Sequence, residues 1–417
     1  MPADLIDIVA ACLFAVALVH TFAARQFERL AHRFPRHAGL FHLLGEVEIV
    51  FGFWAIVLVL AMALLAGGTE ALAYAESRNY TEPLFVFVVM VIAGSRPVLA
   101  AVGRLTDALA RRMPLPPAVA STWLGLALVP LLGSLITEPA AMTLAALMLA
   151  PLAFRREMPE APKYLALGVL FVNVSIGGTL TAYAAPPVLM VAATWHWDSL
   201  HMLVNFGWKS AIAVLINASA VTFLIRRHLV ADAPAVAAQP PVPWPVSLVH
   251  LGLLAAVVAL AHHPVAFIGV LLLFLGFSVA YERHQSPLLV KEALLVGFFL
   301  AGLVVLGGLQ RWWLQPLIAS LQPLALFVGA LGLTAVTDNA ALTYLGSLIE
   351  GLSETSKYML VAGAVAGGGL TVVANAPNPA GLALLRHGFA DGAVGAGRLL
   401  VAALAPTAVA ATALLLL

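Results

Sequence analysis

The sequence predicts an all-α polytopic membrane protein with about ten transmembrane helices and two re-entrant hairpins, arranged as two inverted repeats with broken helices. Three observations support this prediction. Hydrophobic residues make up 62% of the 417 positions, and the mean hydropathy is +1.00. Charged residues make up only 10%, whereas soluble domains contain about 25%. Long apolar stretches recur along the chain, and two short motifs occur once in each half.

A helix that crosses the bilayer needs about 20 apolar residues. The stretches predicted to span the membrane are 4–23, 40–66, 83–103, 163–195, 202–225, 246–262, 264–281, 290–309, 357–385 and 392–416. Two further apolar stretches, 118–153 and 316–349, are too long for one helix, and each has polar residues near its middle. We therefore expect these two stretches to form re-entrant hairpins.

Basic residues set the expected orientation, because cytoplasmic connections of membrane proteins are rich in Lys and Arg. The connections 24–39 and 104–117 contain only Arg and His as basic residues, and Arg outnumbers acidic residues in both. The connection 67–82 instead carries Glu70, Glu76 and Glu82 against Arg78 alone. We expect the basic connections to be cytoplasmic and both termini to be periplasmic.

An Ala/Pro-rich segment, 229–245, divides the chain nearly in half and is predicted to be an extended cytoplasmic linker. Residues 1–228 would form the first repeat, with the hairpin 118–153 and the broken helix 163–195. Residues 246–417 would form the second, with the hairpin 316–349 and the broken helix 357–385. The two halves start on opposite sides of the membrane, so the repeats would be inverted, as in many secondary transporters.

Two motif pairs support the repeat. Residues 137–143 read T-E-P-A-A-M-T and residues 337–343 read T-D-N-A-A-L-T, which pairs Glu138 with Asp338. Residues 177–187 and 367–377 both fit the pattern GG-x-LT-x-x-A-x-x-P. Both pairs occur in the same order and lie in polar interruptions of apolar stretches, so chance similarity is the weaker explanation.

The polar side chains at these motifs are candidate ligands for an ion. A carboxylate inside the bilayer costs a few kcal/mol or more unless it is paired or hydrated, so Glu138 and Asp338 are expected to face a cavity. Hard cations prefer oxygen ligands. The candidate ion- and proton-binding residues are Glu138, Asp338, Asn339, Thr137, Thr337, Thr143, Thr343, Asn375 and Asn378. The alternative is that the two carboxylates form a structural salt bridge.

Glycine and proline residues predict breaks in two spans, because proline removes a backbone donor and clashes with the preceding turn. The predicted helix breaks are Gly177, Gly178, Pro186 and Pro187 in one span and Gly367, Gly368 and Pro377 in the other. Unwound backbone at membrane depth is tolerated where it lines a cavity or is buried in protein. Carbonyl groups freed there would add to the oxygen ligands.

Four of the other charged residues within predicted spans are candidates for a role in transport. Lys209 and Arg398 occupy matching places in the last span of each half and are possible counter-charges, or else structural partners that reach toward an interface. Glu46 and Glu48 have no acidic counterpart in the other half and are a possible proton path, although Glu46 is expected near the membrane surface. The single cysteine, Cys12, cannot form a disulfide or a cysteine metal cluster within the chain.

The four motif segments, 133–141, 177–187, 334–343 and 367–378, resemble the ion transporter superfamily, which includes NhaD-type sodium/proton antiporters, arsenite permeases and sodium-coupled dicarboxylate carriers. The whole chain is most similar to a family of bacterial sodium/proton antiporters. The resemblance implies an inner-membrane protein, usually a dimer, that moves by an elevator-like or rocking motion. Thr137, Glu138 and Pro139 depart from the Ser-Asn-Thr of the dicarboxylate carriers, and a glutamate there disfavours an anionic substrate.

The predicted function is secondary active transport that exchanges sodium or lithium for protons at a midplane carboxylate site by alternating access. The alternative is an anion or metalloid permease on the same scaffold. An intramembrane enzyme is disfavoured, because the sequence offers neither a nucleophile–base pair nor a metal cluster. We expect no cofactor and no metal beyond the transported cation, and the net charge of +1 gives no reason to expect nucleic acid. The expected partners are the lipid bilayer, monovalent cations and a second copy of the chain.

Overall fold

The computed structural model describes residues 5–229 and 240–417, and all regular structure in these ranges is helical. The first half contains α1 (Leu5–Arg33), α2 (Ala38–Gly45), α3 (Val47–Leu65), α4 (Gly68–Glu76), α5 (Thr81–Ala93), α6 (Arg96–Ala110), α7 (Pro117–Leu126), α8 (Leu128–Ile136), α9 (Glu138–Ala153), α10 (Glu160–Gly177), α11 (Pro186–Trp195), α12 (Ser199–Met202) and α13 (Trp208–Ile225). The second half contains α14 (Trp244–Ala259), α15 (Pro264–Ala280), α16 (Val290–Gly307), α17 (Arg311–Ile318), α18 (Pro323–Thr334), α19 (Asn339–Ser347), α20 (Glu354–Gly367), α21 (Pro377–Leu385) and α22 (Ala396–Leu416).

Several of these helices are long and apolar enough to cross a membrane. Within the described ranges there are 6 such helices, or up to 8 if each sharply bent pair counts as one span. The helices α14 and α15 are apolar but shorter, with 16 and 17 residues. The protein is therefore a helical multi-pass membrane protein.

Two predicted spans differ from single straight helices. The span 83–103 consists of α5 and α6, which meet at an angle of 63°. The bend falls at Gly94 and Ser95, and Ser95 has extended backbone. Pro97 lies in the first turn of α6, where its missing N–H costs no helical hydrogen bond. The span 40–66 is interrupted at Glu46, whose backbone is extended. Residues 230–239 of the predicted linker 229–245 lie outside the described residues.

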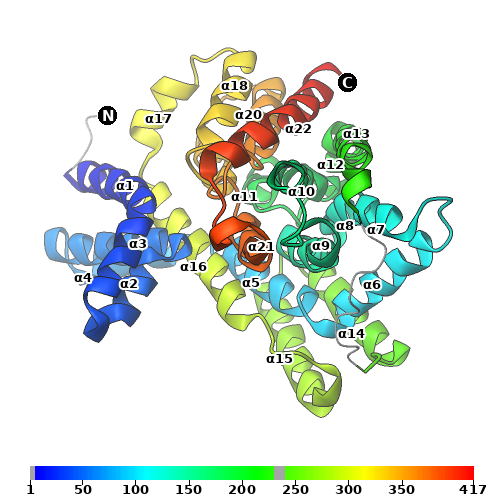
Figure 1. The fold of residues 1–417 in the computed structure, drawn as a ribbon. Helices are drawn as coiled ribbons and strands as arrows, with labels where there is room; N and C mark the ends of the chain where they lie inside the picture. The colour runs from blue at the N-terminus through cyan, green and yellow to red at the C-terminus, as the bar shows by residue number, and fades with distance from the viewer. Residues whose placement is uncertain (1–4, 230–239) are drawn as a thin grey trace.

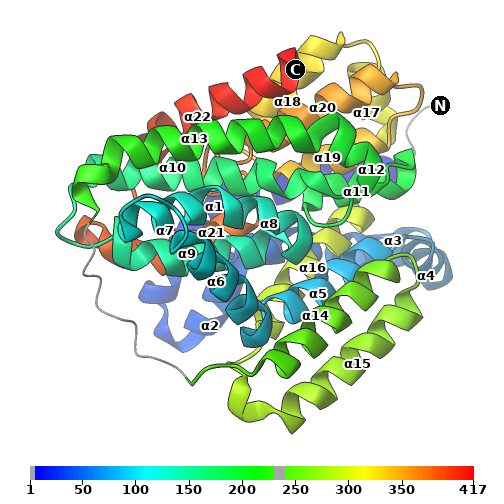
Figure 2. The same ribbon diagram turned by 90° about the vertical axis from the view of Figure 1, so that its right-hand side faces the viewer.

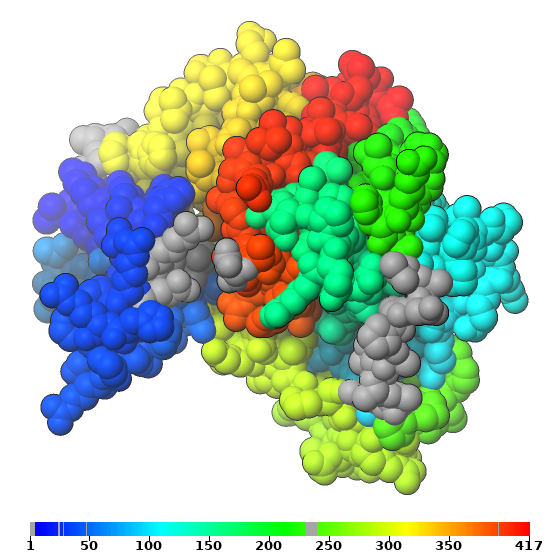
Figure 3. All heavy atoms as spheres, viewed as in Figure 1, coloured from blue at the N-terminus to red at the C-terminus, as the bar shows by residue number. Residues whose placement is uncertain are grey.

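The helices form a flank and a central group. Helices α1 to α4 form one flank of the molecule, shown in blue in Figures 1 and 3. Helices α10, α13 and α22 pack side by side along most of their length (Figure 2). At the centre, α9 packs against α21 (Figure 1), and α11 packs against α19 (Figure 2). Elements from the two halves of the chain therefore cross at the centre.

Each half contains a helical hairpin and a broken helix. In the first hairpin α7 and α8 pack against α9, and the chain reverses at Thr137. In the second hairpin α18 packs against α19, with residues 335–338 between them. Residues 316–318 of the predicted second hairpin belong instead to the separate short helix α17.

The broken helices stop at the glycine pairs and resume at the prolines. Helix α10 ends at Gly177 and α11 begins at Pro186, while α20 ends at Gly367 and α21 begins at Pro377. The second break lies against α10, because a Cβ atom on Gly369 would come within 2.4 Å of the backbone of Val172. This close approach requires glycine at position 369.

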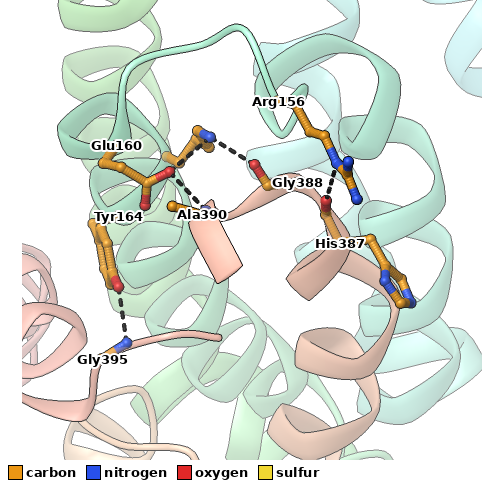
Figure 4. A network of polar contacts seen from close by, with 8 residues as sticks. Arg156, Glu160, Tyr164, His387, Gly388, Ala390 and Gly395 are labelled. Atoms are coloured by element: carbon orange, nitrogen blue, oxygen red, sulfur yellow. Dashed lines mark hydrogen bonds and ion pairs between the residues drawn. The ribbon is translucent and has the colours of Figure 1, made fainter. Parts of the chain in front are cut away.

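The loop between α21 and α22 is fixed onto the start of α10 (Figure 4). The almost fully buried Lys163 donates from Nζ to Gly388 O at 2.6 Å and pairs with Glu160 Oε1 at 2.9 Å. Glu160 Oε1 also accepts the backbone N–H of Ala390, and Arg156 Nε donates to His387 O. These contacts couple the end of the second broken helix to the beginning of the first.

Candidate functional site

Glu138 occupies the tip of the first hairpin and is fully buried, with 0% of its surface exposed. It is the first residue of α9, so its carboxylate lies near the positive end of that helix. The Oε2 atom accepts a hydrogen bond from Asn375 Nδ2 at 2.8 Å, across the boundary between the two halves. A Cβ atom on Gly178 would lie 2.6 Å from Oε1, so the carboxylate fills the space that a side chain at 178 would need.

Five buried oxygen atoms around the two hairpin tips have no hydrogen-bond partner within the part of the chain that the structure describes. They are Thr137 Oγ1, Glu138 Oε1, Asn339 Oδ1, Asn375 Oδ1 and Asn378 Oδ1. A buried polar atom without a partner is costly, so such a group of atoms calls for a ligand. Oxygen donors of this kind are the ligands that hard cations prefer.

The orientation of the Asn378 amide is fixed by its own hydrogen bonds. Its Nδ2 atom donates to Gly368 O at 2.8 Å and to Thr371 O at 2.9 Å. Both partners are carbonyl groups of the second break, so only the amide nitrogen can face them and Oδ1 is left free to accept. Asn375 behaves alike, because its nitrogen donates to the Glu138 carboxylate.

The ends of the broken helices add negative potential to this region. Helices α10 and α20 both end at glycines within the two breaks, and a helix carries partial negative charge at its C-terminus. The following segments α11 and α21 begin with proline, which has no N–H to offer. The ends of α10 and α20 thus offer carbonyl oxygens as possible cation ligands, while the N-terminal ends of α11 and α21 bring partial positive charge to the same breaks.

Four contacts at the first hairpin tip recur at the second. In all four, the hairpin residue moves along the sequence by the same number of positions, and the break residue moves by a second number that is also the same each time. Thr181 Oγ1 donates to Ser134 O as Thr371 Oγ1 donates to Ala335 O, and Glu138 N donates to Ala184 O as Asn339 N donates to Ala374 O. A Cβ atom on Gly177 would meet Pro130 O, as one on Gly367 would meet Leu331 O. A Cβ atom on Gly178 would meet the Glu138 side chain, as one on Gly368 would meet the Asn339 side chain. The same backbone and side-chain geometry is therefore built twice.

These contacts pair Glu138 with Asn339, whereas the sequence match pairs Glu138 with Asp338. They place Thr137, the residue before Glu138, opposite Asp338. The difference of one position is a correction to the expected pairing. The local sequence favours the expected register, because shifting it by one residue leaves only Ala140 matched with Ala341. The backbone hydrogen bonds of Glu138 and Asn339 to the two breaks nonetheless fix the shifted register.

Asp338 caps the second hairpin helix instead of occupying its break. Its Oδ1 atom accepts the backbone N–H groups of Ala340 at 2.8 Å and Ala341 at 3.3 Å, as an N-cap side chain does. The Asp338 and Glu138 carboxylates nonetheless lie close enough for their charges to interact. Asp338 also lines a small cavity together with Glu48.

Three of the candidate threonines do not join this group. Thr143 Oγ1 donates to Pro139 O and Thr343 Oγ1 donates to Ala340 O, so both hydroxyls are satisfied within their own helices. Thr337 lines an apolar groove between α1, α18 and α19. The donated hydrogen bonds leave the lone pairs of the Thr143 and Thr343 oxygens unused. The place of these three threonines in the ligand set stays a prediction.

The structure also places the two possible counter-charges away from the carboxylates. Lys209 Nζ donates to Tyr358 Oη at 2.9 Å and lies 4.6 Å from the centre of that ring. The guanidinium of Arg398 lies 5.9 Å from the centre of the Tyr164 ring. Lys209 thus has a tyrosine partner, and Arg398 lies near both Tyr164 and the Glu160 carboxylate. No described contact joins either cation to Glu138 or Asp338.

Sequence reasoning overlooked three hydroxyl residues that hold the breaks. Ser134 Oγ donates to Gly177 O at 2.7 Å and accepts the N–H of Leu180. Thr181 and Thr371 each tie a break to the first arm of the hairpin beside it. The signal was present, because both threonines belong to the repeated LT dipeptide of the two motifs.

A cavity of about 530 Å³ reaches the first break from the end of the molecule where α5 begins. Its lining includes Glu82 and Asp198, and also Ala182 and Tyr183 of the break itself. The next residue, Ala184, accepts the backbone N–H of Glu138. The cavity therefore leads from two acidic side chains to the backbone beside Glu138.

Comparisons with known proteins place this geometry in a family. The family described as "Putative Na+/H+ antiporter" matches residues 5–417. A search of curated proteins found no match. The crystal structure of the Alcanivorax borkumensis YdaH transporter aligns at 14% identity over 88% of this chain and 96% of that one, with a TM-score of 0.42. With nearly the whole chain matched by one family, the protein belongs to this Na+/H+ antiporter family and is a transporter and not an enzyme.

Proposed function

We propose that the protein exchanges sodium or lithium for protons at Glu138 by alternating access. The observation that carries this proposal is the fully buried Glu138 carboxylate, whose Oε1 atom lacks a partner among the described residues and lies near other unsatisfied oxygens. A sodium ion would be held by Glu138, Asn375 and Thr137, together with backbone carbonyls of the breaks. Asn339 and Asn378 would supply further oxygen atoms on the side of the second hairpin.

Competition for one carboxylate is sufficient for exchange. Burial disfavours an ionised carboxylate, and a bound cation favours it. A proton on Glu138 removes the charge that holds sodium, and a sodium ion displaces the proton. Each species thus leaves the site when the other arrives, and neither needs a bond other than O–H to be made or broken.

The environment of Glu138 favours a cation as substrate. Glu82 and Asp198 give the large cavity a negative lining that raises the local concentration of cations. An anion would meet Glu138 and Asp338 without a nearby positive charge, since Lys209 and Arg398 contact tyrosines elsewhere. The runner-up, an anion or metalloid permease, therefore has less support.

The recurring contacts support two inverted repeats, residues 1–228 and 246–417, that meet at the hairpin tips and breaks. In such a transporter the half-helices and hairpins move as a unit relative to the flank, which exposes the site to each side in turn. We place the protein in a bacterial inner membrane with periplasmic termini, as a homodimer, following the charge pattern and the family resemblance.

Transport assays in proteoliposomes test this proposal. Vesicles containing the protein and a pH-sensitive dye should dissipate an imposed proton gradient when sodium or lithium is added. The Glu138→Gln variant keeps the shape of the side chain and should give no response, with folding checked by size-exclusion chromatography. Wild-type vesicles that ignore monovalent cations but accumulate arsenite or citrate would overturn the proposal in favour of the runner-up.

A further inference from the structure

Glu48 lies in the first turn of α3 and faces Asp338 across a cavity of about 30 Å³. The remaining lining residues are Phe299, Val372, Val373, Asn375, Ala376 and Pro379. A cavity of this volume holds roughly two water molecules, because one water needs about 10–15 Å³. The side chain of Asn375 is 1% exposed, and its unsatisfied Oδ1 atom gives water there a partner.

Charged groups connect this cavity with the surface. Lys291 Nζ pairs with Glu46 Oε1 at 3.1 Å, and their side chains are 71% and 32% exposed. The charges of Glu46 and Lys291 act on Glu48, and the charge of Glu48 acts on Asp338. Glu46 precedes α3, Lys291 lies on α16 and Asp338 lies on the second hairpin. Together they are the charged groups that face Glu48 among the described residues.

On its other side the cavity meets the Glu138 site. Asn375 lines the cavity and donates its amide hydrogen to Glu138 Oε2 at 2.8 Å. The Asp338 and Glu138 carboxylates lie close enough for their charges to interact. Titratable groups therefore follow one another from an exposed ion pair, through Glu48 and Asp338, to the buried carboxylate.

We propose that Glu48 relays protons between the surface at Glu46 and Lys291 and the Asp338 side of the Glu138 site, through water in the 30 Å³ cavity. This inference rests on the proposed function. When the site takes up a proton, a proton from bulk water binds the Glu48 carboxylate and passes through water to Asp338. It then reaches Glu138 as the sodium ion leaves, and only O–H bonds form and break along the way.

The relay and the acidic cavity approach the site from different ends. Glu48 lies at the start of α3, whereas the large cavity is lined by residues at the start of α5, which follows the far end of α3. Protons and sodium thus need not share one narrow entrance. A cavity that holds about two waters admits protons but is too small for a hydrated sodium ion.

Proton release measured by stopped flow separates a relay from a structural role. Purified protein, loaded with protons in a weakly buffered solution, is mixed with sodium chloride in the presence of a pH dye, with choline chloride as the ionic control. We expect Glu48→Gln to release as many protons as the wild type but roughly tenfold more slowly or worse, because a positioned acid–base group is lost. A glutamate that only stabilises the first turn of α3 would leave the rate unchanged, and that result would overturn the relay.

Two further variants complete the test. Ala376→Val fills part of the cavity while leaving Glu48 intact, so it should slow release even if Glu48→Gln does not fold. Glu292→Gln removes an exposed carboxylate beside Lys291 that does not line the cavity, and should release protons at the wild-type rate. If Glu48→Gln released no protons while Glu138→Gln still released them, Glu48 would be the exchange site and the relay would be refuted. A wild-type protein that releases none would instead refute the proposed function.

Discussion

The two hairpin tips share one backbone plan but differ in charge. At the first tip the side chain that fills the break is the carboxylate of Glu138, next to Gly178. At the second tip the same place, next to Gly368, is occupied by the neutral amide of Asn339. The acidic residue of the second tip, Asp338, lies one position earlier, where it caps α19. Under the proposed function, the duplicated scaffold carries its proton-exchanging group at the first tip alone.

The largest expected difference follows from neutralising the two matched side chains. Glu138→Gln should reduce sodium-driven proton movement in vesicles to background, because the amide cannot exchange a proton near neutral pH. Asn339→Ala should slow transport by roughly tenfold while leaving it coupled to protons, because only a neutral ligand is lost. Equal loss of coupling in both variants would show that the tips are functionally equivalent.

A milder comparison places a methyl group in each break. In Gly178→Ala the new Cβ would lie 2.6 Å from Glu138 Oε1 and must displace the carboxylate. In Gly368→Ala it would lie 2.1 Å from Ser175 Oγ and disturb only neutral groups. Both variants should lose about 1–3 kcal/mol of stability through crowding, measured by thermal denaturation in detergent.

The two glycine variants should differ in how sodium binding depends on pH. That dependence should change in Gly178→Ala and stay like the wild type in Gly368→Ala, because only the first touches the titrating group. The same change in both variants would contradict the assignment of the exchange site to one tip.

Two substitutions at Asp338 separate its cap from its charge. Asparagine is as good an N-cap as aspartate, so Asp338→Asn should keep the thermal stability of the wild type. Asp338→Ala should lose about 1 kcal/mol, because the N–H groups of Ala340 and Ala341 lose their acceptor. Both variants should slow antiport to a similar extent, and full activity in Asp338→Asn would remove Asp338 from the proton route.

The smallest effect is expected at Lys209. Its ammonium contacts Tyr358 and neither carboxylate, so Lys209→Met should change the antiport rate by less than about twofold, with a stability loss below about 1 kcal/mol. Vesicle assays and thermal denaturation measure the two quantities. Loss of transport in a stable Lys209→Met protein would restore the counter-charge hypothesis.

Local chemistry made much of this architecture predictable. Glycine and proline pairs marked where α10 and α20 end, because these residues act on the backbone of their own segment. The repeated motifs at 137–143 and 337–343 marked both hairpin tips, because their polar residues interrupt apolar stretches. Glu138 and Asn375 could be singled out because amide and carboxyl groups rarely lie inside apolar stretches without a polar partner. The structure joins the two by a hydrogen bond, and their role in ion binding stays a prediction.

Features that depend on distant contacts were not predictable. The register that pairs Glu138 with Asn339 is fixed by hydrogen bonds to Ala184 and Ala374, which no local pattern reveals. The tyrosine partner of Lys209 lies 149 residues away along the chain. The bend between α5 and α6 was missed because the two helices together are apolar enough for one span, and a hydropathy average does not reveal a change of direction.

Calorimetry of sodium binding tests the central claim most directly. Titrations in buffers of different ionisation enthalpy report how many protons leave as sodium binds. If Glu138 binds either a proton or a cation, the wild type should release up to about one proton per sodium ion, and Glu138→Gln should release none. Equal proton release by the two proteins, or sodium binding by the wild type without any release over the whole pH range of stability, would contradict the account.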